Sequence, residues 1–384
     1  MKKVFYIGAI ALILFEIANV YFIMPMYGSQ EIPSIDVAYF LHTYRWFFRI
    51  AFGLMILSSF FKAFNSNYKY AKYLSSSVLA LVLGVFYMTN YQMAADSMFL
   101  KPTNLILKNA ENNKVKTDKL IIGVSLNGQA KAYPIQYLGY HHQVADSIDN
   151  QPIMVTYCTV CRTGRVFRPL VHGKIEQFRL VGMDHFNAMF EDKTTKSWWQ
   201  QATGTAITGV LKGQQLPEVF SQQMALSQWL LLHPNTQIMQ ADSTFKEEYE
   251  AMDTYDLGKG RGKLTETDSL SWNRKSWVIG IEIGENSKAF DWNRLVKERV
   301  INDFVGTQPI LLALAADNKS FVAYERFSQT STFLIQNDTL ILDNQHFTLN
   351  GQATDDNKTV LKPIHAYQEF WHSWWNFHPK TLKY

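Results

Sequence analysis

The size and charge of the chain limit the kinds of protein that it can be. Its 384 residues are 47% hydrophobic, which is enough to build more than one domain. Residues 1–99 carry seven Lys or Arg and four Asp or Glu of the totals of 37 and 33, which leaves 30 against 29 in the remainder. Because this near balance provides no basic stripe to neutralise phosphates, nucleic acid is excluded as a partner.

The first hundred residues predict a membrane domain with three transmembrane helices. Residues 4–24, 46–61 and 73–91 are apolar runs that approach or reach the roughly 20 residues needed to cross a bilayer. The first run is long for a signal peptide, lacks an Ala-x-Ala site after it and precedes two further runs. We therefore expect an integral membrane protein that keeps its first span.

The positions of the basic residues predict the orientation of these spans. Residues 25–37, between the first two spans, contain no Lys or Arg. The basic residues instead lie before the first span and between the second and third, namely Lys2, Lys3, Lys62, Lys69 and Lys72. By the positive-inside rule, the N-terminus is cytoplasmic and everything after about residue 100 is extracytoplasmic, where disulfides can form.

After a linker at residues 100–119, the pattern changes to short strands separated by turn residues. Asn127-Gly128 between two such strands is a strong hairpin signal, because both residues tolerate a positive φ. We expect strands at 120–126, 130–134, 153–158, 165–171 and 174–181, a hairpin at 189–200, and helices at 135–144, 224–232, 292–299 and 366–377. The predicted class is α+β, dominated by strands.

The strand-rich region also contains an internal repeat. When the chain is moved so that Gly123 meets Gly280, residues 123–153 align with residues 280–310 without a gap. Further identities are Lys131 with Lys288, Ala132 with Ala289, Leu138 with Leu295, Asp146 with Asp303, and Gln151-Pro152-Ile153 with Gln308-Pro309-Ile310. We therefore expect a duplicated soluble domain, with repeat 1 at residues 120–245 and repeat 2 at residues 246–384, after a membrane domain at residues 1–99.

The two cysteines of the chain, Cys158 and Cys161, form a Cys-x-x-Cys pair in repeat 1. The same offset places Ala315 and Asn318 at these positions in repeat 2, so the second copy does without them. A disulfide that closes a loop of four residues contributes only about 2 kcal/mol in the chain-entropy model, against about 4.7 kcal/mol for a hundred-residue loop. The pair therefore indicates a function more than a structural crosslink.

The first hypothesis is a thiol/disulfide redox site on the extracytoplasmic side of the membrane. In it Cys158 is the attacking thiol and Cys161 the resolving one, and Arg162 and Arg165 lower the thiol pKa. His141 is the candidate proton acceptor. The expected partners are the membrane and a periplasmic redox protein.

Two alternatives remain open. Cys158 and Cys161 with His141 would suit copper or zinc, in a module that binds the metal or delivers it to a partner protein. A structural zinc site needs four ligands, and the chain has no second cysteine pair. The other alternative is a non-catalytic scaffold whose repeats hold a membrane partner.

Several motifs in order resemble the bacterial family called domain of unknown function 3179. They are residues 127–134 (NGQAKAYP), His141 before Val144 and Asp146, residues 152–161 with the two cysteines, and Trp198-Trp199-Gln200 with Gly204. The family pattern has Pro after the first cysteine and Gly after the second, where this chain has Thr159 and Arg162. The resemblance implies a bacterial protein, so we expect the predicted membrane to be the cytoplasmic membrane and the domain after residue 100 to be periplasmic. The family carries no established activity.

The family-like segment after the cysteines supplies further candidates to line the site. These are Asn187, Glu191, Trp198 and Gln200. Trp198 and Trp199 are adjacent in a predicted strand, so we expect one ring in the core and one facing outward.

Overall fold

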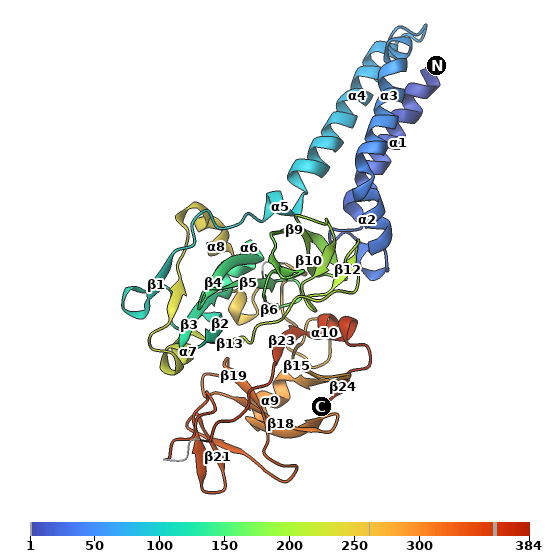
Figure 1. The fold of residues 1–384 in the computed structure, drawn as a ribbon. Coiled ribbons are helices and arrows are strands. Elements are labelled where there is room, and N and C mark those ends of the chain that lie inside the picture. Colours follow the sequence, from blue (N-terminus) through green and yellow to red (C-terminus); the bar gives the residue numbers. More distant parts are fainter. Residues whose placement is uncertain (1, 261, 356–358) are drawn as a thin grey trace. The chain divides into compact units, whose positions relative to one another are not determined.

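The structure is a computed structural model that describes residues 2–260, 262–355 and 359–384 (Figure 1). The chain forms two compact units. The first unit extends to Leu100 and also includes Gln177–Gln200 and Thr205–Gln214, and the second comprises Lys101–Glu176, Gln201–Gly204 and Gln215–Tyr384. This division differs from the expected domains, because part of the expected repeat 1 belongs with the apolar helices.

Three helices of the first unit are long and apolar enough to cross a membrane, near the three predicted runs. They are α1 (Lys2–Tyr21), α3 (Arg45–Phe64) and α4 (Ala71–Tyr87), which the π-helix η2 (Met88–Gln92) extends. Shorter helices in this unit are η1 (Ser29–Glu31), α2 (Ile35–Thr43) and α5 (Ala95–Met98). Inside the bundle Arg49 donates to both carboxylate oxygens of Glu16, at 2.6 and 2.9 Å, and Asn90 donates to Glu16 at 3.0 Å. The pairing satisfies charges that would be costly in a bilayer.

A four-stranded antiparallel sheet completes the first unit. Its order is β12-β11-β10-β9, from β9 (Phe178–Asp184), β10 (Asn187–Asp192), β11 (Trp198–Gln200) and β12 (Ala206–Thr208). Gly182 of β9 lies so close to the chain after α1 that an added Cβ would be 2.3 Å from the Ile23 carbonyl oxygen. The Met183 N–H donates to that same oxygen at 2.7 Å. This close approach joins the sheet to the end of α1.

The second unit begins with three sheets and the helices between their strands. Their orders are β1-β14-β3-β2-β13, β4-β5-β6 and β7-β8. The strands are β1 (Leu107–Asn109), β2 (Leu120–Leu126), β3 (Gln129–Pro134), β4 (Gln143–Ile148), β5 (Gln151–Cys158), β6 (Thr163–Phe167), β7 (Leu170–Val171), β8 (Lys174–Ile175), β13 (Gln222–Ala225) and β14 (Gln237–Met239). The helices are η3 (Ala110–Asn112), α6 (Ile135–His141), α7 (Leu226–Leu232), η4 (Ser243–Phe245), α8 (Lys246–Ala251) and η5 (Tyr255–Leu257).

The rest of the second unit contains three further sheets. Their orders are β23-β15-β16-β24, β17-β18-β19 and β20-β21-β22. The strands are β15 (Trp277–Ile283), β16 (Asn286–Asp291), β17 (Val300–Val305), β18 (Gln308–Leu314), β19 (Phe321–Glu325), β20 (Leu334–Gln336), β21 (Thr339–Leu342), β22 (Gln345–Phe347), β23 (Tyr367–Phe370) and β24 (Leu382–Lys383). The helices are α9 (Trp292–Glu298) and α10 (Trp371–Phe377).

Two predicted helices are at least three residues shorter than expected, each for a local reason. The helix predicted at 135–144 ends at His141, because His142 adopts a left-handed conformation (φ 59°) and Gln143 begins β4. The helix predicted at 366–377 begins only at Trp371, because residues 367–370 pair with β15 as β23. In both places hydrogen bonding to a neighbouring strand replaces the last or first helical turns.

In two sheets of the second unit, one strand packs against a tryptophan from a short helix. An added Cβ on Gly123 of β2 would be 2.4 Å from the Trp229 ring, and one on Gly280 of β15 would be 2.1 Å from the Trp374 ring. Both tryptophans are fully buried, and both donate from Nε1 to a threonine, Thr236 or Thr381. Glycine is required here to let the ring lie flat against the strand.

The Gly280–Trp374 contact yields a test of this packing. We expect Gly280→Ala to destabilise the full chain by about 1–3 kcal/mol, because the methyl group would overlap the indole. The measurement is thermal unfolding in detergent, with Gly262→Ala as the control, since nothing lies within 4 Å of a Cβ added there. Equal stability of the two variants would contradict the close approach.

Candidate functional site: the cysteine turn

The two cysteines lie in a tight turn between β5 and β6. Cys158 is the last residue of β5 and pairs with Thr163, the first residue of β6. The intervening residues 159–162 form the turn, and Arg162 closes it with a left-handed backbone (φ 59°). The cysteine turn, which we define as residues 158–162, is therefore a hairpin turn and contains no helix N-terminus.

Residues far along the chain hold the carbonyl groups of the cysteine turn. The Tyr255 hydroxyl donates to the Thr159 carbonyl at 2.8 Å, and the Phe370 N–H donates to the Cys161 carbonyl at 2.9 Å. Lys275 Nζ donates to the Val160 carbonyl at 2.6 Å, and His372 Nε2 lies 3.2 Å from the same oxygen. Irregular backbone needs such partners when it is buried, so the later half of the second unit stabilises the turn.

Arg162 is fully buried and is bound by this later half. Its guanidinium donates to the Gln368 side chain at 3.0 Å and to the backbone carbonyls of Tyr255 and Asp256 at 3.3 Å. It also stacks on Trp277, 3.9 Å from the ring centroid. These contacts make Arg162 a structural anchor of the turn.

Arg165 is also buried and is engaged by side chains other than the thiols. It donates to Glu369 at 2.8 Å, lies 3.7 Å from Glu218 and stacks on the Tyr367 ring. Burial alone would lower the pKa of Arg165, but Tyr367 and the two carboxylates raise it. The guanidinium therefore stays charged and paired with acids.

Both thiols are completely buried and are not joined by a disulfide. Burial raises the pKa of Cys161 well above its ordinary value, and a hydrogen bond to Cys158 adds to the increase. The direction is opposite to the lowering that we expected from Arg162 and Arg165. Ser373 and Lys275 act the other way, and Lys275 is the cation that influences Cys161.

Lys275 is the unusual titratable group beside the cysteine turn. Burial lowers its pKa to about 8, while its attraction to Cys161 and Cys158 partly offsets this shift. An amine with a pKa near neutrality can both accept and release a proton. Burial also lowers the pKa of His372 to about 3, so this imidazole is neutral at physiological pH.

His141 lies in an aromatic cluster at the end of α6. Its Nε2 is 2.6 Å from the Tyr249 hydroxyl, and its ring packs against Phe245. Within the described part of the chain, no three His, Cys, Asp or Glu side chains gather closely enough to hold a metal ion. The expected copper or zinc ligand set of Cys158, Cys161 and His141 is thus not brought together.

The sequence reasoning missed Lys275, His372 and Ser373. These residues lie more than a hundred positions after the cysteines, and no spacing rule links them to the turn.

The other expected site residues lie in the first unit. Glu191 and Trp198 are buried in its sheet, where the Trp198 indole donates to Glu191 at 3.0 Å. Trp199 is buried as well and donates to Asp192 at 3.0 Å. The expectation of an outward-facing ring is wrong, because both indoles find carboxylate partners inside the unit.

Comparisons with known proteins identify a family and no function. A family model described as "Protein of unknown function (DUF3179)" matches residues 103–381, most of the chain. No curated protein and no solved structure matches the chain.

Burial of the thiols predicts low reactivity. We expect iodoacetamide to label the folded chain at least about tenfold more slowly than the urea-unfolded chain, because reaction requires local opening. Since the thiolate is the nucleophile and burial raises the pKa of Cys161, its labelling should accelerate only above the pH at which an ordinary thiol ionises. Cys158→Ser and Cys161→Ser assign the rates, and equal rates in the folded and unfolded chains would contradict the burial.

The Arg165–Glu369 pair predicts a structural effect. Arg165→Met should destabilise the chain by about 3–5 kcal/mol, because it leaves the Glu369 carboxylate buried without its cation. Adding Glu369→Leu should recover part of the loss, and Arg168→Met serves as the control. Unchanged unfolding with altered thiol labelling would instead favour the role in lowering the thiol pKa.

Proposed function

We propose that this chain, which belongs to the DUF3179 family, is a membrane-anchored thiol–disulfide redox protein with Cys158 and Cys161 as its active pair. The observation that carries the proposal is a half-buried amine beside the cysteine turn. Lys275 Nζ donates to the carbonyl of Val160, which lies between the two cysteines, at 2.6 Å, and its pKa of about 8 suits proton exchange with a thiol.

The reaction is thiol–disulfide exchange with a partner protein. The neutral Lys275 amine takes the proton of Cys161, and the thiolate attacks a partner disulfide to form a mixed disulfide and release one partner thiolate. The second cysteine, Cys158, then attacks the mixed disulfide, which forms the Cys158–Cys161 disulfide and releases the second partner thiol. Two electrons pass to the partner, and its two sulfurs receive the two thiol protons.

This mechanism exchanges the expected roles of the two cysteines. Burial raises the pKa of Cys161, and Ser373 and the charge of Lys275 oppose this increase. Stabilisation of a thiolate by these two groups favours Cys161 as the attacking thiol. Cys158, at the end of β5, then resolves the mixed disulfide.

Access to the thiols requires a local opening, since neither has exposed surface. The segment that carries Lys275 suits this role, because residues 258–260 and 262–276 form no helix or strand. Segments with few backbone hydrogen bonds in regular structure open at low free energy. Opening would move the amine and uncover the cysteine turn in one step.

The proposed location is the bacterial cytoplasmic membrane, with the N-terminus inside and the second unit in the periplasm. The basic residues that support this orientation occur at the start of α1, at the end of α3 and at the start of α4. An oxidising compartment is where a reversible disulfide can operate.

We also propose that the second unit arose from two copies of one motif. The order β2-β3-α6-β4-β5-β6 is matched by β15-β16-α9-β17-β18-β19, and a residue with a positive φ, His142 or Arg299, follows the helix in each. A Lys–Asp ion pair recurs at matched positions, between Lys131 and Asp146 and between Lys288 and Asp303. The copy without cysteines supplies Lys275, His372 and Ser373 around the thiols.

Redox titration tests the proposed function. The full chain is equilibrated in glutathione buffers and the thiols are trapped with acid and counted by mass spectrometry. We expect one reversible two-electron transition with a potential above about −300 mV, the limit typical of structural disulfides. Cys158→Ser and Cys161→Ser should abolish the transition.

The role of Lys275 has its own readout. Lys275→Met should slow exchange and remove its pH dependence near pH 8, whereas Lys297→Met, an exposed lysine of α9, should leave both unchanged. A pair that stays reduced in every buffer, or that oxidises only after unfolding, would contradict the proposed function.

A further inference from the structure

The first unit contains a cavity of about 630 Å³, independent of the cysteines. The cavity lies where the three apolar helices end: Asn19 comes from the last turn of α1, Arg45 begins α3, and Asn90 belongs to η2. The sheet supplies Arg179 and Glu191 from its strands β9 and β10. A volume of this size is typical of small-molecule sites.

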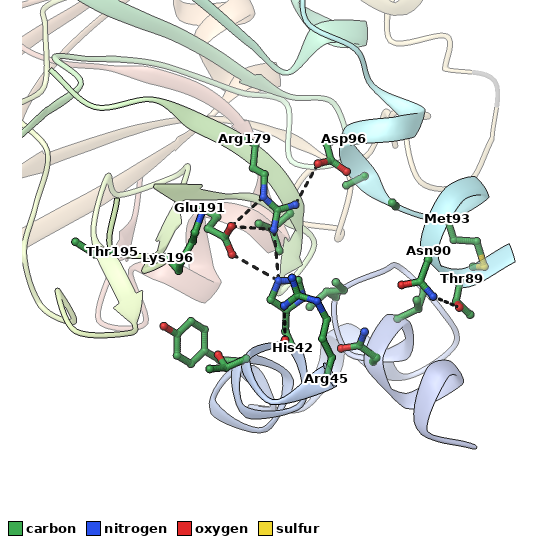
Figure 2. A pocket seen from close by; sticks show the side chains of 18 residues that line it. His42, Arg45, Thr89, Asn90, Met93, Asp96, Arg179, Glu191, Thr195 and Lys196 are labelled. Carbon is green, nitrogen blue, oxygen red and sulfur yellow. Dashed lines mark hydrogen bonds and ion pairs between the residues drawn. The ribbon is translucent and has the colours of Figure 1, made fainter. Parts of the chain in front are cut away.

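Most of the charge in the cavity is internally paired (Figure 2). Arg179 donates to Glu191 at 2.9 Å and to Asp96 at 3.1 Å, and His42 Nε2 lies 3.6 Å from Glu191. Burial would raise the pKa of Glu191, but the hydrogen bond from His42 and the charge of Arg179 lower it to about 2. Burial lowers the pKa of His42, so this imidazole is neutral at physiological pH.

Two cations remain after this pairing. The Arg45 guanidinium donates to the His42 carbonyl, and no carboxylate of the described residues forms an ion pair with it. Lys196, in the turn between β10 and β11, also lines the cavity, and its ammonium has no ion pair within the described part of the chain. The cavity thus offers an arginine fork and an ammonium to an anion.

Asn19 indicates that the ligand should also carry a hydrogen-bond donor. Its side chain lines the cavity with only 7% of the residue exposed, and its Oδ1 accepts no hydrogen bond from the residues that the structure describes. A buried acceptor without a partner is unfavourable. Since Oδ1 has no surface open to the cavity, rotation of the side-chain amide would bring it to a ligand that donates a hydroxyl or amine proton.

Apolar side chains form part of the remaining wall, beside Tyr39 and three threonines. Val20 and Ile23 follow Asn19 along the chain, and Met93 and Val181 come from the segment after η2 and from β9. Apolar surface beside two cations and an amide fits an amphiphile better than a bare inorganic ion.

We propose that this cavity binds a phosphate-bearing polyol head group, held by Arg45 and Lys196 at the phosphate and by Asn19 at a hydroxyl. A fatty acid lacks the hydroxyl donor, and a choline head group would bring a cation against two cations. The glycerol phosphate head of an anionic membrane lipid meets each requirement, and its acyl chains can continue along the apolar wall. Free glycerol phosphate shares this chemistry without the chains.

Calorimetric titration of the full chain in uncharged detergent distinguishes an anionic lipid from free glycerol phosphate as the ligand. The probes are dihexanoyl phosphatidylglycerol, dihexanoyl phosphatidylcholine and glycerol 3-phosphate. We expect the phosphatidylglycerol to bind at least about tenfold more tightly than the other two. If glycerol 3-phosphate binds as tightly as phosphatidylglycerol, the head-group site is supported and its ligand is a soluble molecule. Equal binding of the two lipids, or binding of none of the three, would overturn the proposal.

Variants locate the binding. Arg45→Gln should weaken it about tenfold, and Lys196→Gln and Asn19→Leu by smaller factors of about three. Lys193→Gln is the matched control, because this exposed lysine in the same turn does not line the cavity. Because Lys196 is exposed, its variant keeps the test valid if Arg45→Gln does not fold. Affinities equal to that of the control in all three variants would refute the site.

Discussion

The hydrogen bonds to the three carbonyl groups of the cysteine turn are the constraint on which the proposed redox site depends. Thr159, Val160 and Cys161 are buried in a turn, beyond the paired residues of β5 and β6, so the pairing of these strands does not supply donors to their carbonyl groups. Tyr255, Lys275 and Phe370, all from later in the chain, supply the donors. A buried carbonyl left without a donor would cost about as much as a lost hydrogen bond, so the turn keeps its shape only while the later half is folded against it.

The same packing determines the chemistry available to the thiols. Burial disfavours charge, which raises the pKa of Cys161 and lowers that of Lys275. The two shifts bring the groups toward a state in which thiol and amine are both neutral and a proton can pass between them. Arg162 and Arg165 contribute differently: they are bound by Gln368, Glu369 and backbone carbonyls, so their charges stabilise the contact between the halves.

The sequence predicts most of the elements and only part of the site. Hydropathy locates the apolar helices, and Asn127-Gly128 marks the hairpin of β2 and β3, because both signals are local. The end of α6 is not predicted, because the left-handed residue that ends it is His142, whereas glycine is the usual sequence signal at this position. The start of α10 is missed because pairing with β15 decides it, and such pairing is a tertiary effect.

For the residues around the thiols, too, local contacts are predictable from the sequence and tertiary contacts are not. Cys158, Cys161 and Arg162 are close in sequence and therefore close in space, whereas Lys275 and His372 reach the turn only through the fold. His141 was expected beside the cysteines because it precedes them by a short distance, yet its ring packs against Phe245 and approaches Tyr249. Proximity in sequence predicts which residues form the turn, whereas the packing of the two halves of the second unit determines which residues surround it.

The most direct test of the redox account is the state of Cys158 and Cys161 in intact cells. Cells that produce the chain are treated briefly with dithiothreitol, washed, and quenched with acid before the thiols are trapped and counted. The account predicts a reduced pair after the treatment and a return to the disulfide after the wash. A pair that remains in one state throughout, with the chain folded in the membrane, would contradict it.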